Sequence, residues 1–206
     1  RVTHVLHMGA ESHVDRSITD PMSFVTANVV GTTNMLELAR GLPNLELFIY
    51  FSTDEVFGPV PLDPSYPGHK EDAVHNPKNP YAATKSAGEQ MVTSFANTYG
   101  MPCIITRQMN IFGERQHPEK FIPKVIRSVM NGETVPIHAT PDRKQAGMRH
   151  YIHARNVADA HMFLLKNTPW TKAAPGHVDS YHIVGEREVD NLMLAQMIEG
   201  FVKELA

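Results

Sequence analysis

The chain has 206 residues, a formal net charge of -3, 42% hydrophobic residues and 20% charged residues. This composition supports a packed core and argues against extensive disorder. No block of like charges occurs, and no stretch approaches the roughly 18 apolar residues needed to span a bilayer. We therefore expect neither nucleic acid nor a membrane as a partner.

The cysteine and histidine content sets two further expectations. Cys103 is the single cysteine, which excludes an internal disulfide and fits a reducing, cytoplasmic location. The 12 histidines include His150 and His153, three residues apart, but no paired cysteines and no His-Glu-x-x-His pattern accompany them. We predict no metal site.

The N-terminal part begins with a strand and a long helix. An apolar run over Val5–Ala10 is typical of a buried strand that leads into a close turn. After Asp20 and Pro21, one stripe at helical spacing predicts a helix that ends near Gly41. The stripe consists of Phe24, Ala27, Asn28, Gly31, Met35, Leu38 and Ala39.

The middle of the chain continues this alternation. Leu47–Ser52 is continuously apolar, as in a strand buried on both faces of a parallel sheet. Residues 59–80 carry six prolines and predict a long ordered loop, a kind of segment that is usually functional. A helix over Tyr81–Tyr99 and a strand over Cys103–Thr106 follow. This order implies a doubly wound parallel α/β sheet.

The pattern after Gly113 is less regular and suggests a smaller second lobe. It predicts three helices and one strand, namely helices over 118–130, over 155–166 and from 191 onward, and a strand over 181–184.

Two motifs carry candidate chemistry. Tyr81 and Lys85 are four residues apart, which places them on one helical face, where an ammonium would lower the pKa of the phenol and make it a usable base. Alone, this spacing also fits a solvated helix face. Asp54 and Glu55 directly follow a predicted buried strand. Burial and mutual repulsion there can keep one carboxyl protonated, as an acid, and the other ionised, as a base. Alone, the two residues also fit a polar turn.

Together, in this order and spacing, these motifs resemble the extended short-chain dehydrogenase/reductase family, and within it the dTDP-glucose 4,6-dehydratases. Colinear segments carry the resemblance, at residues 10–17, 28–32, 52–58, 79–85, 107–113 and 118–123. The resemblance implies a Rossmann-like sheet, incomplete at its N-terminus. Residues 1–113 would be the remainder of the NAD-binding domain, and residues 114–206 would contribute the substrate lobe and return to the sheet.

The resemblance also implies a set of roles. Tyr81, assisted by Lys85, would take the proton of the sugar 4-hydroxyl while NAD accepts a hydride from C4. Thr53 would hydrogen-bond the 4-oxygen, Glu55 would remove the C5 proton, and Asp54 would protonate the departing 6-hydroxyl.

Further positions match the family's ligand-binding segments. Those expected to line NAD are Ala10, Glu11 and Ser12, together with Tyr81 and Lys85. Those expected to bind a nucleotide-diphosphate sugar are Asn110, Glu119, Lys120 and Arg149, together with Thr53. Arg149 is the candidate for the nucleotide phosphates, because a guanidinium is a charged, directional donor.

The sequence also departs from the pattern of these enzymes. It has no Gly-x-x-Gly-x-x-Gly loop, and we expect this loop to belong to a preceding segment on the order of 60–80 residues, with a further segment after the final helix. Asn110–Glu114 and Arg149–Tyr151 differ from the usual motifs, which leaves the base and the sugar open.

Two other readings stay open. One is another NAD-dependent nucleotide-sugar epimerase or decarboxylase, although the Asp54–Glu55 pair argues against a simple epimerase. The other is a non-catalytic fragment that retains the fold. Family resemblance also implies a homodimer formed through the helices at 21–40 and 81–99.

Overall fold

The computed structural model describes residues 1–60, 65–167 and 178–205. The chain forms two compact units, Arg1–Gln108 with Asn167–Ile183, and Met109–Lys166 with Val184–Ala206. The first boundary between the two units therefore follows Gln108, whereas the sequence predicts a domain boundary after residue 113. The assignment of cofactor and substrate roles to these parts stays a prediction.

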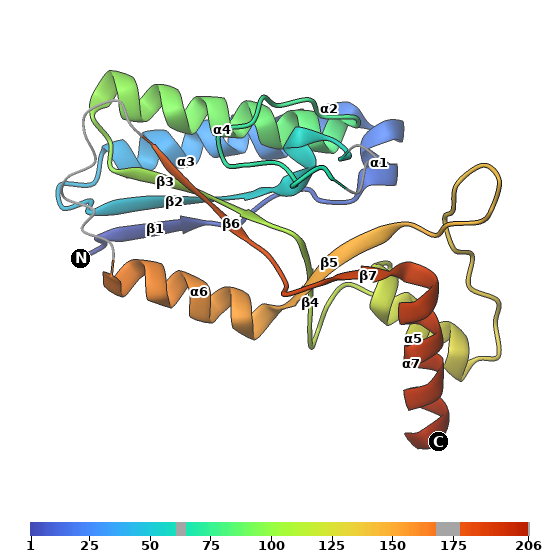
Figure 1. Ribbon diagram of the computed structural model, residues 1–206. Coiled ribbons are helices and arrows are strands. Elements are labelled where there is room, and N and C mark those ends of the chain that lie inside the picture. The colour runs from blue at the N-terminus through green and yellow to red at the C-terminus, as the bar shows by residue number, and fades with distance from the viewer. Residues whose placement is uncertain (61–64, 168–177, 206) are drawn as a thin grey trace. The chain divides into compact units, whose positions relative to one another are not determined.

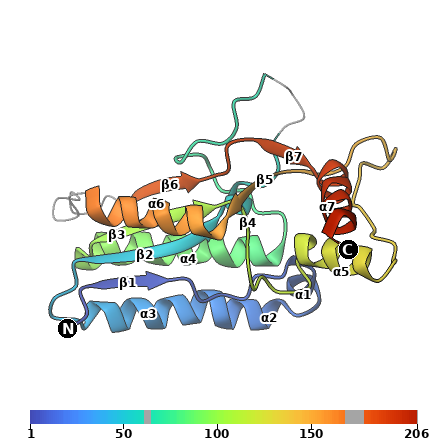
Figure 2. The ribbon, with the colours of Figure 1, turned by 90° about the horizontal axis from the view of Figure 1, so that it is seen from below.

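The first unit contains a four-stranded sheet in which all neighbouring strands are parallel. Its order is β1 (His4–His7), β2 (Leu47–Thr53), β3 (Cys103–Gln108) and β6 (Asp179–Ile183). Figures 1 and 2 show α3 (Gly31–Arg40) and α4 (Pro80–Tyr99) side by side over one face of this sheet. The predicted parallel α/β class is confirmed.

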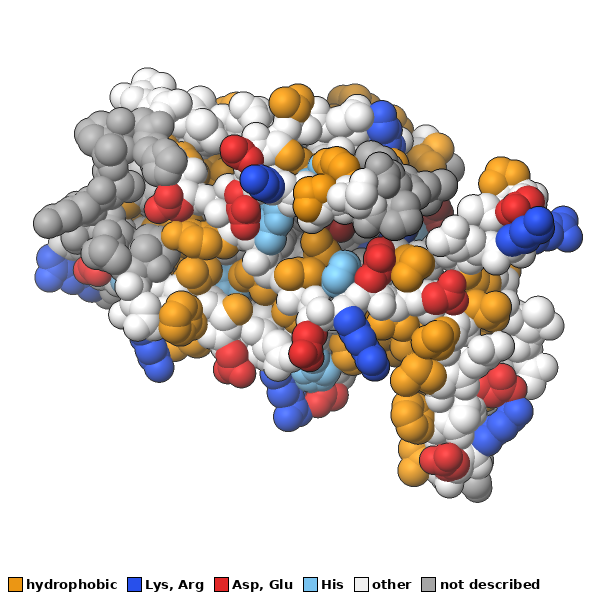
Figure 3. Space-filling view, in the orientation of Figure 1, with side chains coloured by type: hydrophobic (Ala, Val, Ile, Leu, Met, Phe, Trp, Pro, Cys, Tyr) orange, Lys and Arg blue, Asp and Glu red, His pale blue; other side chains and the backbone are white. Residues whose placement is uncertain are grey.

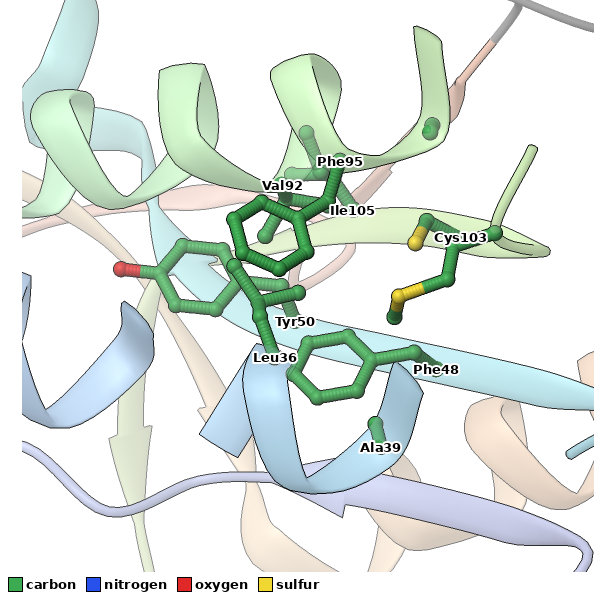
Figure 4. Packing of buried hydrophobic residues seen from close by; sticks show 10 residues of the cluster. Leu36, Ala39, Phe48, Tyr50, Val92, Phe95, Cys103 and Ile105 are labelled. Atoms are coloured by element: carbon green, nitrogen blue, oxygen red, sulfur yellow. The ribbon is translucent and has the colours of Figure 1, made fainter. Parts of the chain in front are cut away.

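The core of this unit lies between the sheet and these two helices (Figure 4). Large apolar side chains from both layers interdigitate and exclude water, which supplies the main driving force for holding α4 against β2. The labelled members are Leu36, Ala39, Phe48, Tyr50, Val92, Phe95, Cys103 and Ile105.

The long helix predicted after Pro21 is continuous but changes its winding. It consists of α2 (Pro21–Phe24), the π-helix η1 (Val25–Val30) and α3. The predicted stripe is wrong at Leu38, which is 58% exposed, while Leu36 is fully buried. Because a π turn bonds each residue to the fifth one along, it rotates the following α-helix and brings a different residue to the core.

The first strand is less buried than the sequence predicts. It ends at His7 rather than at Ala10, and Leu6 and Met8 are 36% and 63% exposed. In the described structure β1 pairs only with β2 and forms an edge of the sheet. An edge strand keeps part of its apolar surface in solvent, which accounts for the difference.

The proline-rich segment is a loop in its described part, although residues 61–64, with two of its prolines, lie outside the described residues. The loop begins at Gly58, which has a φ of 74°. A Cβ at this position would lie 2.5 Å from the Asn76 carbonyl oxygen, so both the backbone angle and the space require glycine. Asn76 N in turn donates to Val56 O at 2.8 Å, which ties the end of the loop to its start.

The second unit contains a small mixed sheet that the sequence did not predict. β4 (Asn110–Phe112) is parallel to β5 (Met148–His153), and β5 is antiparallel to β7 (Glu188–Asp190). Two of these strands have only three residues, which is too short for an alternating pattern to stand out.

Three helices complete this unit, α5 (Phe121–Met130), α6 (Ala154–Asn167) and α7 (Asn191–Leu205). The predicted start of α5 at Pro118 is wrong. Pro123 lies three residues into the observed helix, and a proline fits only the first turn, where its missing N–H would have no intrahelical partner. Figure 3 shows apolar side chains gathered along one side of α7, which exposes Met193, Met197 and Phe201.

Within the described residues, no helix is long and apolar enough to cross a membrane. In the same parts of the chain, no group of three or more histidine, cysteine, aspartate or glutamate side chains is placed to hold a metal ion.

Candidate active site

The two candidate carboxylates lie where β2 ends and a short 3-10 helix, η2 (Asp54–Phe57), begins. Thr53 is the last residue of the strand and the N-cap of η2. Its Oγ1 accepts a hydrogen bond from Glu55 N at 3.3 Å and donates to Asp54 Oδ1 at 3.2 Å. One hydroxyl therefore fixes the turn that carries both carboxylates at the carboxyl end of a parallel strand.

Asn79 joins this turn to the start of α4. Its side-chain Oδ1 accepts from Ala82 N at 2.8 Å and caps the helix, while its Nδ2 donates to Glu55 Oε2 at 2.9 Å. Pro80 occupies the first helical position, where the absence of an N–H costs nothing. Sequence analysis treated Asn79 only as part of a motif, although an Asn-Pro pair before a helical pattern signals an N-cap.

Tyr81 lies in the first turn of α4, and its surroundings favour the protonated form of its phenol. Burial raises the pKa of its phenol, the carboxylate of Glu55 raises it further, and a side-chain hydrogen bond with Thr53 acts in the opposite direction. The ring of Phe24 packs edge-on against it, with centroids 6.4 Å apart. The expected lowering of this pKa by Lys85 is therefore wrong for the structure as it stands.

Lys85 lies one helical turn further along and faces the sheet. Its Nζ donates to Phe51 O at 2.5 Å and lies 4.2 Å from the centroid of the Tyr50 ring. Burial lowers the pKa of this ammonium to about 8, and the nearby Glu89 carboxylate partly opposes the shift. The ammonium is therefore bound to a carbonyl near the end of β2, and it is not among the groups that shift the pKa of Tyr81.

Ala10, Glu11 and Ser12 form an exposed segment after β1. The side chain of Asn28, from the π-helix, binds this segment on both sides, because Glu11 N donates to Asn28 Oδ1 at 2.8 Å and Asn28 Nδ2 donates to Glu11 O at 2.9 Å. The same Nδ2 lies 2.9 Å from Thr84 Oγ1 in α4. A single buried amide thus connects the predicted cofactor segment to the helix that carries Tyr81 and Lys85.

A buried ionic network lies behind the site, and sequence analysis missed it. Arg107 of β3 makes a bidentate contact with Glu89 of α4, with Nη2 and Oε2 at 2.7 Å. Ser52 Oγ donates to the other carboxylate oxygen at 2.5 Å, and His75 Nε2 is 3.4 Å from Oε2. Burial raises the pKa of Glu89, but the hydrogen bonds from His75 and Arg107 outweigh this effect and lower it.

Apart from Thr53, which lies in the first unit, the predicted substrate residues belong to the second unit. Asn110 lies on β4 and donates from Nδ2 to His150 O at 3.4 Å, and Arg149 lies on the adjacent strand β5. Glu119 and Lys120 lie just before α5, with Lys120 as its N-cap. Asn110 and Arg149 are therefore on neighbouring strands, while Glu119 and Lys120 share one turn.

In the first unit, the structure brings together the residues on which the predicted chemistry depends. Asp54 and Glu55 act electrostatically on Tyr81, and Thr53 hydrogen-bonds to it. Lys85 lies on the same helix, and its ammonium binds the carbonyl of Phe51, two residues before Thr53. A carboxylate pair, a phenol and an ammonium thus meet at the carboxyl end of β2, where open α/β sheets bind ligands.

Comparison with known proteins identifies the family that has this fold and this site. The chain matches the NAD dependent epimerase/dehydratase family over residues 1–174, and it belongs to that family.

Individual relatives are more specific. The chain is 36% identical to a dTDP-glucose 4,6-dehydratase of Haemophilus influenzae, over 98% of this chain and 58% of the relative. It is also 36% identical to a trifunctional UDP-glucose 4,6-dehydratase/UDP-4-keto-6-deoxy-D-glucose 3,5-epimerase/UDP-4-keto-L-rhamnose-reductase of Arabidopsis thaliana, over 90% of this chain and 26% of that protein.

Among solved structures, the chain is similar to a dTDP-glucose 4,6-dehydratase of Streptomyces venezuelae with NAD bound. The TM-score is 0.82 and the identity 31%, and the match covers 96% of this chain and 56% of that one. The chain thus spans about half the length of the dTDP-glucose 4,6-dehydratases that it matches.

Proposed function

We propose that the protein containing this chain is an NAD-dependent nucleotide-sugar 4,6-dehydratase, which converts an NDP-hexose into its 4-keto-6-deoxy derivative. The observation that carries the proposal is the meeting of Thr53, Asp54 and Glu55 with Tyr81 at one strand end. An epimerase leaves the 6-hydroxyl of its sugar in place and needs no acid to expel it, whereas a dehydratase does, and a carboxylate pair lies beside the phenol in this site.

The residues present fit the nicotinamide end of NAD. Lys85 has three N–H donors, of which Phe51 O takes one, and a ribose hydroxyl is a suitable acceptor for another. Ala10, Glu11 and Ser12 are exposed at the carboxyl end of β1, the edge at which such sheets bind dinucleotides. NAD, when bound, supplies a hydride acceptor for C4, a hydride donor for C6 and a positive charge on its oxidised ring.

Tyr81 acts first, as the base for the sugar 4-hydroxyl. Burial and the nearby carboxylates raise the pKa of its phenol, so the positive charge near it must increase before it can take this proton. Thr53 shares a hydrogen bond with Tyr81, and in the proposed mechanism its hydroxyl hydrogen-bonds the same 4-oxygen. Lys85 contributes to the positive potential from one turn further along α4.

The carboxylates act second, in the elimination of water. Oxidation at C4 acidifies the C5 proton, which Glu55 removes, and Asp54 protonates the departing 6-hydroxyl. Thr53 and Asn79 hold the two carboxyl groups from different directions. Asp54 and Glu55 thus have different hydrogen-bond partners, which supports the proposal that one is the acid and the other the base.

The nucleotide is the less defined part of the substrate. dTDP-glucose is the first candidate and UDP-glucose the second, because relatives named for each are equally similar to the chain. On the second unit, Asn110, Glu119, Lys120 and Arg149 are the proposed contacts for the sugar, the diphosphate and the base.

The proposed assembly is a homodimer formed through the helices at 21–40 and 81–99. These helices lie side by side on one face of the sheet, and Met22, Val30 and Leu38 expose apolar surface there. Light scattering of the intact protein should give twice the chain mass. A monomer at micromolar concentration would contradict this part of the proposal.

The proposed activity is tested by NMR of dTDP-glucose, and in parallel UDP-glucose, incubated with NAD⁺ and the intact protein. A 4-keto-6-deoxy sugar should form from at least one of them. Tyr81→Phe removes the proton acceptor and keeps the ring that packs on Phe24, so turnover should fall by at least about 100-fold while the fold is retained. Equal turnover by the variant would exclude Tyr81 as the base.

A further inference from the structure

We propose that Asn79 is a positioning residue that couples the Glu55 carboxylate to the first turn of α4, so that the proton acceptor for C5 is aligned with Tyr81. The inference rests on the proposed dehydratase function. It adds Asn79 to the site, because the sequence motif did not predict that this residue contacts Glu55. Its basis is one amide side chain that makes two different hydrogen bonds.

The two hydrogen bonds of the Asn79 side chain join it to different parts of the site. Oδ1 of Asn79 accepts from Ala82 N at 2.8 Å, which any good N-cap residue can do. Nδ2 donates to Glu55 Oε2 at 2.9 Å, so the acceptor and the donor are two different atoms at the end of one amide. Serine and threonine have a single, shorter hydroxyl for both contacts, and an aspartate carboxylate has no donor. Capping alone therefore does not account for the contact with Glu55.

The bond to Glu55 closes a ring of contacts around the site. Glu55 N is held by Thr53 Oγ1, and its carboxylate is held by Asn79, which begins the helix of Tyr81. The charged and titratable groups that act on the same point are Asp54, from η2, and the Tyr81 phenol, from α4. A hydrogen bond to the ionised form favours a carboxylate that is ready to accept a proton.

Two substitutions separate alignment from capping. Asn79→Ser keeps a cap and replaces the amide that donates to Glu55 with a shorter hydroxyl. Asn79→Asp also keeps a cap but sets a second carboxylate against Glu55, which opposes its ionisation. Asn76→Ser is the matched control, because Asn76 is exposed and its amide oxygen accepts from the exposed Lys78 ammonium rather than from a group of the site.

Both Asn79 variants should melt close to the unmodified protein and should still reduce NAD⁺ on mixing with the sugar nucleotide. Product formation should fall about 10-fold or more, because a misplaced acceptor slows removal of the C5 proton. In Asn79→Asp the acid limb of the pH–rate profile should move to higher pH. Equal losses in NAD⁺ reduction and product formation, or an unmoved acid limb, would overturn the proposal.

A measurement without turnover keeps this inference distinct from the proposed function. Carbon NMR of the Glu55 carboxyl, assigned through Glu55→Gln, gives its titration midpoint in substrate-free protein. The midpoint should move to higher pH in Asn79→Asp and stay in place in Asn76→Ser. An unmoved midpoint in Asn79→Asp overturns the coupling whether or not the protein is a dehydratase, whereas absent turnover with a moved midpoint contradicts only the activity.

Discussion

His7 shows how burial of one titratable side chain makes stability depend on pH. Burial lowers the pKa of this imidazole to about 4 from an ordinary value of 6.5, and the Lys85 ammonium adds to the shift. Between these values the unfolded chain binds a proton that the folded chain does not. Stability is therefore complete above pH 6.5 and falls as the pH drops toward 4, by up to about 3 kcal/mol.

The control for this prediction is His7→Gln, which can keep a hydrogen bond to Thr32 Oγ1, 3.0 Å from His7 Nε2 in the structure, but cannot ionise. Denaturant titrations at pH 4.5 and 7 should show a smaller difference in the free energy of unfolding for the variant. The same difference in both proteins would mean that His7 does not cause the loss.

At the scale of elements, the packing of α4 on β2 depends on Gly88. A Cβ at this position would lie 2.1 Å from the Tyr50 hydroxyl oxygen and 2.7 Å from Tyr50 Cζ, and Tyr50 is fully buried. Gly88→Ala should therefore destabilise the protein by about 1–3 kcal/mol, although alanine is the better helix former.

Gly200, in α7, is the matched control. A Cβ there meets nothing within 4 Å, so only helix propensity acts and Gly200→Ala should stabilise the protein by about 0.5–1 kcal/mol. Opposite signs in urea denaturation support the close approach of α4 to β2. A stabilising effect at both positions would contradict it.

The sequence predicts the elements of the first unit well, because their apolar patterns are long. β2, α3 and α4 contribute most of the core, and their positions follow from buried runs and helical stripes. The π-helix is not visible in the sequence, since its winding depends on contacts such as those of Asn28 with the segment after β1. The short strands of the second unit escape prediction because three residues carry no usable period.

Some features of the candidate site can likewise be predicted from the sequence, and others cannot. Thr53, Asp54, Glu55, Tyr81 and Lys85 are predictable because each stands at a fixed offset from a strand end or a helix start. The pKa of Tyr81 is not predictable in this way, because it depends on burial and on the nearby carboxylates of Asp54 and Glu55. The Glu89–Arg107 pair joins residues 18 positions apart on different elements, so spacing within one helix or strand gives no sign of it.

For the whole molecule, the central claim is that a hydride leaves C4 of a sugar and returns to C6 of the same sugar. The most direct measurement uses dTDP-glucose or UDP-glucose carrying deuterium at C4, incubated with NAD⁺ and the intact protein, with NMR of the product. The account predicts a 4-keto-6-deoxy sugar with the deuterium in its C6 methyl group. Deuterium that remains at C4 of an epimerised sugar would contradict the dehydratase account and favour an epimerase.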